Sequence, residues 1–240
     1  MYETILSRFR EFSKKCDNNT WLIVLVALGL NGLHAGIMAL MAPAGVSLPV
    51  ATCRWDCHWY KEITVHGYNA VPRLYDSIRQ AQAAWAFFPL YPLAVHAVSV
   101  LTHQGMEWSG FALNFLLWPV LIGLCYKDSV RRIGKIDPLL FVAFFIIYPF
   151  NIWYSAQYTE TLYGLFLLLL VMGLQRSGVV LPAVAAFFLC LSRPTGLVIT
   201  VVLCLWMGGQ ALRSLRAKSV GTCLARSLPY VLAIVSGGAG

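Results

Sequence analysis

Long runs without a charged residue alternate with short polar links along this chain. Eight windows contain no Asp, Glu, Lys or Arg, and they cover residues 18–53, 80–106, 108–126, 138–159, 161–175, 177–192, 194–212 and 227–240. A helix needs roughly 17–25 apolar residues to cross a bilayer. The windows 161–175 and 177–192 are short and would borrow flanking residues to span. The pattern predicts an all-α fold, a polytopic bundle of membrane helices.

Composition supports this class and bears on the domain organisation. Hydrophobic residues make up 59% of the 240 positions and charged residues only 12%, whereas soluble domains carry about 25% charged residues. The mean hydropathy is +0.69. No polar second domain interrupts the windows. We therefore expect residues 1–240 to form a single transmembrane domain.

The first twenty residues differ from the rest of the chain. They are too polar for the apolar part of a cleaved signal peptide, and the apolar stretch after Trp21 is long enough to span. Ile5, Phe9 and Phe12 recur at helical spacing with basic residues beside them. This arrangement is typical of a helix that lies on a membrane surface. We expect residues 1–20 to be a cytoplasmic amphipathic segment.

The net charge of +8 is explained by membrane topology, so no nucleic-acid partner is expected. Lys and Arg gather at residues 8–15, 127–135, 176 and 213–226. If every window crossed, 5 of the 18 basic residues would be cytoplasmic, and if one of the two windows 80–106 and 108–126 did not cross, 13 would be. The positive-inside rule favours the second arrangement.

The segment expected not to cross is 80–106, which contains Pro89, Pro92, His96 and His103. Irregular backbone at membrane depth is tolerated where protein or a water-filled cavity covers it. We expect residues 43–108 to form an extracytoplasmic loop with interfacial or re-entrant helices. The same parity places Asp56, Glu160 and Arg193 on the face away from the cytoplasm.

An ionisable cluster lies between two uncharged windows, and its centre is Asp56. Charged groups pressed against apolar segments are costly to maintain, so they are functional candidates. If the segment is helical from about Asp56, then Trp59, Tyr60 and Ile63 share its face. A purely structural alternative has Asp56 capping a helix in an interfacial loop. The spacing alone does not choose between the two.

Three further motifs have both a functional and a structural interpretation. Residues 87–92 read Phe-Phe-Pro-Leu-Tyr-Pro, which is either part of a lipid-binding groove or a kinked membrane segment. Glu160 is either a second carboxylate facing Asp56 or a favourable charge in the first turn of a helix. Arg193 is either a phosphate ligand or a side chain that extends to the membrane interface.

Seven cysteines are scattered along the chain, and only Cys53 and Cys57 are close together. With His58 they suggest zinc only weakly, because a structural zinc site uses four ligands. A disulfide between them is another alternative. Plain packing is the preferred interpretation of these cysteines, and no metal is expected.

Together these motifs resemble one family. Residues 54–60 read Arg-Trp-Asp-Cys-His-Trp-Tyr, 66–68 read His-Gly-Tyr and 86–93 read Ala-Phe-Phe-Pro-Leu-Tyr-Pro-Leu. They resemble the first-loop signature of PIG-V-like mannosyltransferases, the second mannosyltransferases of GPI-anchor synthesis and their bacterial relatives. Two later stretches, 149–162 and 193–196, resemble the next two motifs of that family in the same order. The resemblance covers residues from about 20 to 212.

The resemblance implies a GT-C glycosyltransferase. Such an enzyme moves mannose, or a similar hexose, from a polyprenyl- or dolichyl-phosphate donor to an extracytoplasmic glycolipid or glycan acceptor, with inversion. Asp56 would be the general base. Arg193 would contact the donor phosphate, with Arg54 and Lys61 as lesser candidates. The remaining candidates for substrate contact are Trp55, Tyr60, Tyr158 and Glu160. No cofactor is implied, because the sugar arrives already activated on its lipid.

The resemblance also implies a location and a length. The expected location is a bacterial inner membrane, with the endoplasmic reticulum as the alternative, and the active site faces away from the cytoplasm. Family members are commonly longer, so the chain is expected to be an N-terminal portion or a truncated relative. The alternatives are a lipid or solute transporter, or an inactive fragment that contacts a partner subunit.

Overall fold

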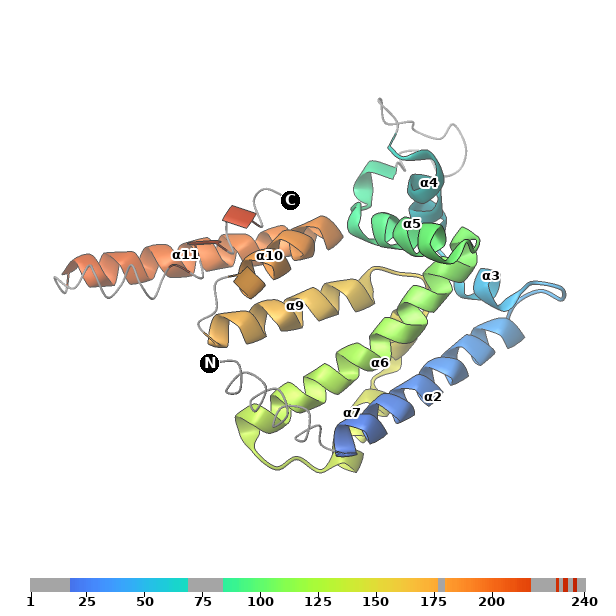
Figure 1. Cartoon of the computed structure of the whole chain (residues 1–240), viewed down its shortest axis with the longest axis horizontal. Helices are drawn as coiled ribbons and strands as arrows, with labels where there is room; N and C mark the ends of the chain where they lie inside the picture. Colours follow the sequence, from blue (N-terminus) through green and yellow to red (C-terminus); the bar gives the residue numbers. More distant parts are fainter. Residues whose placement is uncertain are drawn as a thin grey trace, which may run out of the picture.

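The computed structural model describes residues 18–68, 84–176 and 180–216, together with residues 228, 231–232 and 235–236. Every regular element in this described part is a helix, which confirms the all-α prediction for it. Figure 1 shows their arrangement. The elements are α2 (Asn18–Leu40), α3 (Leu48–Thr52), α4 (Cys57–His66), η1 (Ala84–Ala86), α5 (Leu90–Thr102), α6 (Met106–Ile133), α7 (Pro138–Ile147), η2 (Pro149–Asn151), α8 (Ile152–Ser155), α9 (Glu160–Gln175), α10 (Val180–Ser192) and α11 (Pro194–Arg216).

The apolar helices α2 and α6 pack side by side and run in opposite directions (Figure 1). Their shared core contains Ile23 and Ala27 of α2 and Trp118 and Ile122 of α6. Gly123 lets the helices approach closely, because a Cβ there would lie 2.6 Å from a methyl group of Val24. Burial of these apolar groups between two helices forms the centre of the fold.

Pro119 removes one backbone hydrogen bond of α6, and a side chain of α2 supplies the missing donor. Proline has no N–H, so the carbonyl of Phe115, four residues earlier, loses its helical donor. The Nδ2 of Asn31, fully buried in α2, donates to that carbonyl at 2.9 Å. A buried amide in an apolar helix is thus explained by a proline in its neighbour.

Among the described residues, two helices are long and apolar enough to cross a membrane, α2 and α6. A third span exists if Pro138–Ile147 and Pro149–Ser155, which meet at an angle of 78°, count as one broken crossing. The helices α5, α9 and α10 have 13, 16 and 13 residues, fewer than a crossing needs. The described helices therefore support a membrane protein, while a larger GT-C bundle stays a prediction.

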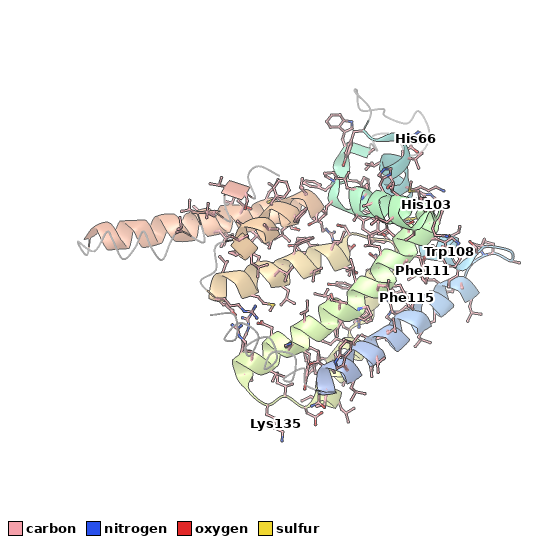
Figure 2. All side chains as sticks on the ribbon, in the orientation of Figure 1. His66, His103, Trp108, Phe111, Phe115 and Lys135 are labelled. Atoms are coloured by element: carbon pink, nitrogen blue, oxygen red, sulfur yellow. A yellow bond between two sulfur atoms is a disulfide. The ribbon has the colours of Figure 1, made fainter. Side chains whose placement is uncertain are left out.

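The α2–α6 pair has two chemically different ends. At one end, here called the loop end, α2 finishes, α6 begins, and α3, α4 and α5 gather; His66 and His103 lie there (Figure 2). At the other end, here called the basic end, α6 finishes and Lys135 projects (Figure 2). Residues 1–17 and 69–83 lie outside the described residues, and residues 18–20 form the first turn of α2.

Candidate active site

Asp56 lies at the loop end, immediately before the first residue of α4. It occupies the N-cap position, but its side chain accepts no capping hydrogen bond. Asp137 before α7 behaves differently, since its Oδ1 accepts from the amides of Leu139 and Leu140 at 2.8 and 3.0 Å. The Asp56 carboxylate is exposed, and no described residue donates a hydrogen bond to it. The structural alternative therefore predicted the N-cap position of Asp56 correctly, but the capping hydrogen bond that it implied is not formed.

The backbone around Asp56 is held in an unusual conformation. Trp55 has a φ of +46°, which bulky residues rarely adopt, and such residues cluster at ligand sites. Its indole is 65% exposed and lies 4.6 Å, between ring centroids, from that of Trp153. Trp153 in turn contacts Tyr158 at 5.4 Å. These rings form an aromatic wall beside the carboxylate.

A disulfide joins Cys53 to Cys57, and it corrects the prediction that these cysteines only pack. The chain turns back between the end of α3 and the start of α4, which brings the two Cα atoms to 5.2 Å. That separation lies within the usual range for a disulfide. The bond encloses residues 54–56 and uses both thiols that a zinc site would need.

The polar segment between α8 and α9, residues 156–159, forms hydrogen bonds to α3, the helix just before the Asp56 loop. The amide of Gln157 donates through Nε2 to the Pro49 carbonyl at 2.6 Å and to Oγ1 of Thr52 at 3.0 Å. Nδ2 of Asn114, fully buried in α6, donates to the carbonyls of Ala156 and Tyr158. The sequence interpretation missed both amides. An Asn inside an uncharged apolar window was the available signal, because a buried polar group needs a partner.

Tyr158 connects this segment to Asp56. Its hydroxyl accepts a hydrogen bond from the Asp56 amide at 3.1 Å. Burial raises the pKa of the Tyr158 phenol to about 12, although that hydrogen bond offsets part of the rise. Burial, and then the Glu160 carboxylate, raise the pKa of Tyr60 well above its usual value. The ring of Tyr60 lies edge-on to Tyr158 at 6.4 Å, so two neutral phenols adjoin the carboxylate.

Arg193 has a partner, unlike the lone cation that the sequence indicated. Its Nη1 lies 2.6 Å from Oε1 of Glu160, the first residue of α9. Nearby, Oγ1 of Thr159 donates to the carbonyl of Ser192 at 3.3 Å. Oε2 of Glu160 is buried, and no described group bonds to it. A phosphate at Arg193 would therefore share the guanidinium with Glu160.

Gly196 explains why the last motif contains a glycine. Its added Cβ would lie 2.4 Å from the carbonyl oxygen of Leu189, a backbone atom of α10. The turn from α10 into α11 is therefore too tight for a side chain. Because Arg193 lies in this turn, Gly196 contributes to its position beside Glu160.

The two lesser cationic candidates are placed differently. Arg54 donates through Nε to the Ala51 carbonyl at 2.7 Å and through Nη2 to the Met38 carbonyl at 3.4 Å. Lys61 forms an ion pair with Glu107 at the start of α6. The structure thus brings Asp56, Trp55, Tyr60 and Tyr158 into direct or adjoining contact, and it engages Lys61 in an ion pair of its own.

The described part of the chain has a cavity of about 460 Å³ beside Asp56, lined by Met38, Met41, Cys53, Arg54, Trp55, His58 and Ile152. Ligand pockets commonly have volumes of about 300–1,000 Å³. The cavity lies between the end of α2 and the disulfide-bonded loop. It gives the loop end room for a ligand beside Arg54, Trp55 and His58, the sequence neighbours of Asp56, although Asp56 itself does not line it.

No protein-family model, curated protein or solved structure matches this chain. The resemblance to PIG-V-like mannosyltransferases therefore rests on the sequence motifs.

Proposed function

We propose that this chain is a membrane glycosyltransferase that moves mannose, or a similar hexose, from a polyprenyl-phosphate donor to an extracytoplasmic glycolipid or glycan acceptor. Asp56 is the general base that removes the proton of the acceptor hydroxyl as the anomeric carbon inverts. The observation that carries the proposal is the exposed carboxylate of Asp56, which has an N-cap position but makes no cap bond. It is free to accept a proton from a substrate.

The surroundings of Asp56 support this role. A general base must come within hydrogen-bond reach of the proton that it abstracts, and the exposed Trp55 offers a flat face for a sugar ring beside it. Pockets that combine aromatic walls with a few polar groups are typical of small-molecule sites. The hydroxyl of Tyr158 lies close to this loop, since it accepts a hydrogen bond from the Asp56 amide at 3.1 Å.

The Glu160–Arg193 pair suits the departing phosphate. A cation next to the leaving group stabilises the charge that develops on it, and Glu160 fixes the orientation of the guanidinium. The planar fork of Arg binds phosphate oxygens through two parallel donors. In this proposal Arg193 contacts the donor phosphate and Glu160 is its positioning residue.

The proposed side of the membrane rests on two observations. In the predicted topology, in which residues 80–106 do not cross, 13 of the 18 basic residues lie on the side opposite the Asp56 loop, as the positive-inside rule requires of the cytoplasmic side. The Cys53–Cys57 disulfide lies in that loop, and disulfides persist in oxidising compartments outside the cytoplasm. Both favour an extracytoplasmic site in a bacterial inner membrane or, as the alternative, in the endoplasmic reticulum.

A transporter is the second candidate, and one observation favours it. The pair Pro138–Ile147 and Pro149–Ser155 is bent by 78°, and broken membrane helices form the binding sites of many transporters. Transport predicts uptake of a solute or lipid into proteoliposomes without chemical change. Transfer predicts a new glycosidic product.

The discriminating experiment uses the purified 240-residue chain in lipid nanodiscs with radiolabelled polyprenyl-phosphate mannose and a panel of glycolipid and glycan acceptors. We expect a mannosylated product with inverted configuration from the lipid-linked donor, and none from a nucleotide-linked mannose. The parallel assay measures uptake by proteoliposomes. Uptake without a glycosidic product would replace the proposal with transport, and the absence of both would reject the two candidates.

A further inference from the structure

The cavity next to Asp56 contains a cation without a counter-charge. Arg54 is half-buried, and no Asp or Glu in the described part of the chain pairs with it. Its hydrogen bonds go to the neutral carbonyls of Ala51 and Met38. A guanidinium has more N–H donors than these bonds use. A partly desolvated charge is costly unless an anion neutralises it, so Arg54 favours an anionic ligand in this cavity.

The cavity wall contains a second hydrogen-bond donor, the imidazole of His58. His58 lies on the first turn of α4 and lines the cavity with Arg54. Its imidazole is exposed and offers a ring N–H in either tautomer. Arg and His together supply charge-assisted and neutral hydrogen bonds to one anion. Phosphate oxygens fit this pair, because Arg binds them through a planar fork.

The remaining wall is apolar and lies at the end of a membrane helix. Met38 belongs to the last turn of α2, and Met41 is the first residue after this helix. Leu40 and Met41 are 87% and 78% exposed, as expected for side chains that contact lipid. Ile152 of α8 and the indole of Trp55 complete the apolar lining. A ligand in this cavity therefore has an anionic group beside Arg54 and a hydrocarbon part along α2.

We infer that this cavity is a binding site for a membrane lipid that carries a phosphate, with the phosphate on Arg54 and His58 and the first methylenes against Met38, Met41 and Trp55. The cavity of about 460 Å³ holds the headgroup and the beginning of a chain. The rest of the chain lies along the exposed side of α2. The site is separate from the Glu160–Arg193 pair, and it does not require that the chain transfers a sugar.

Native mass spectrometry of the detergent-purified chain tests the inference, with dioleoyl phosphatidic acid as the probe and dioleoylglycerol, which has the same chains but no phosphate, as the control. We expect one phosphatidic acid molecule to bind about tenfold or more tightly than dioleoylglycerol, as a charge-assisted hydrogen bond to the phosphate implies. Arg54→Gln should lower that preference to near unity. Lys135→Gln, which removes the same charge at the basic end (Figure 2), should keep it.

Two further variants test the inference if Arg54→Gln disturbs the fold. Arg54→Lys retains the charge and should preserve part of the preference, while Met41→Trp fills the apolar part and should weaken the binding of both lipids. Excess inorganic phosphate should not displace phosphatidic acid. An unchanged preference in folded Arg54→Gln would overturn the inference. Displacement by inorganic phosphate at matched concentration would overturn it too, because the cavity would then be a site for the free anion.

Discussion

Replacing Asn114 with Ala tests whether the polar segment after α8 positions the catalytic loop. Nδ2 of Asn114 donates to the carbonyls of Ala156 and Tyr158, and the hydroxyl of Tyr158 accepts from the Asp56 amide. The substitution removes both bonds without touching Asp56. We expect a loss of stability and, because Tyr158 loses its anchor, a loss of transfer.

The expected loss of stability follows from the partners that the substitution leaves behind. Two net hydrogen bonds contribute about 1–3 kcal/mol together. The Ala156 carbonyl keeps the Tyr158 amide as a donor at 2.8 Å, whereas the Tyr158 carbonyl loses its donor in Asn114. Oδ1 of Asn114 is buried and no described group bonds to it, so its removal offsets part of the cost. We expect about 1–3 kcal/mol, equivalent to about 2–12 °C in Tm for a chain of this size.

Asn31→Ala is the matched control. Asn31 is equally buried and also donates to backbone carbonyls, that of Phe115 at 2.9 Å and that of Asn114 at 3.5 Å, but none of its bonds goes to the segment after α8. Both variants should lose similar stability in thermal unfolding followed by size-exclusion chromatography. Transfer per folded molecule should fall about tenfold or more only in Asn114→Ala, because small misplacements of reacting groups are costly. Equal transfer by both folded variants would refute the positioning argument.

The other predictions concern the donor contact, the disulfide and the topology. Arg193→Lys should retain part of the transfer activity, because Lys keeps the charge but not the planar fork of donors. Arg193→Ala should lose most of the activity through a higher KM for the donor. Normal donor kinetics in Arg193→Ala would contradict this. Replacing Cys53 and Cys57 with Ser should lower the free energy of unfolding by about 2 kcal/mol, seen as a lower Tm, and should lower the initial rate of transfer. Unchanged values of both would show that the disulfide is dispensable. Single cysteines at His66 and Lys135, in a background without other thiols, should react with an impermeant maleimide from opposite sides of the membrane, and labelling from one side would exclude the proposed topology.

The helices were predictable from the sequence where apolar composition decides the structure. Uncharged windows of 15 residues or more predict helices because a helix satisfies its own backbone groups in lipid, and α2 and α6 fall inside or across such windows. The break in the window 138–159 also had a signal, since Pro149 disfavours helical backbone at Tyr148 before it. Composition does not fix where each helix stops, and α6 accordingly continues to Ile133, seven residues beyond the end of its window at residue 126.

The position of Asp56 was predictable, but its surroundings were not. Motif and charge single out Asp56 because it lies in an ionisable cluster between two uncharged windows. The partners that build its site are distant in sequence: Glu160 and Arg193 are separated by 33 residues, and Asn114 and Ala156 by 42. Contacts at such separations depend on how the helices pack. The Cys53–Cys57 disulfide also needs the backbone reversal between α3 and α4, which spacing alone does not indicate.

The most direct measurement is the initial rate of mannose transfer by Asp56→Asn beside Asp137→Asn. Each variant loses one carboxylate at the start of a helix, but Asp137 uses its carboxylate for capping, a role that Asn retains. Asp56→Asn should lower the rate by about 10²-fold or more, the usual contribution of a general base, with unchanged protein level and Tm. Asp137→Asn should stay within about twofold of the wild type. A rate for folded Asp56→Asn as high as that of Asp137→Asn would contradict the assignment of Asp56 as the base.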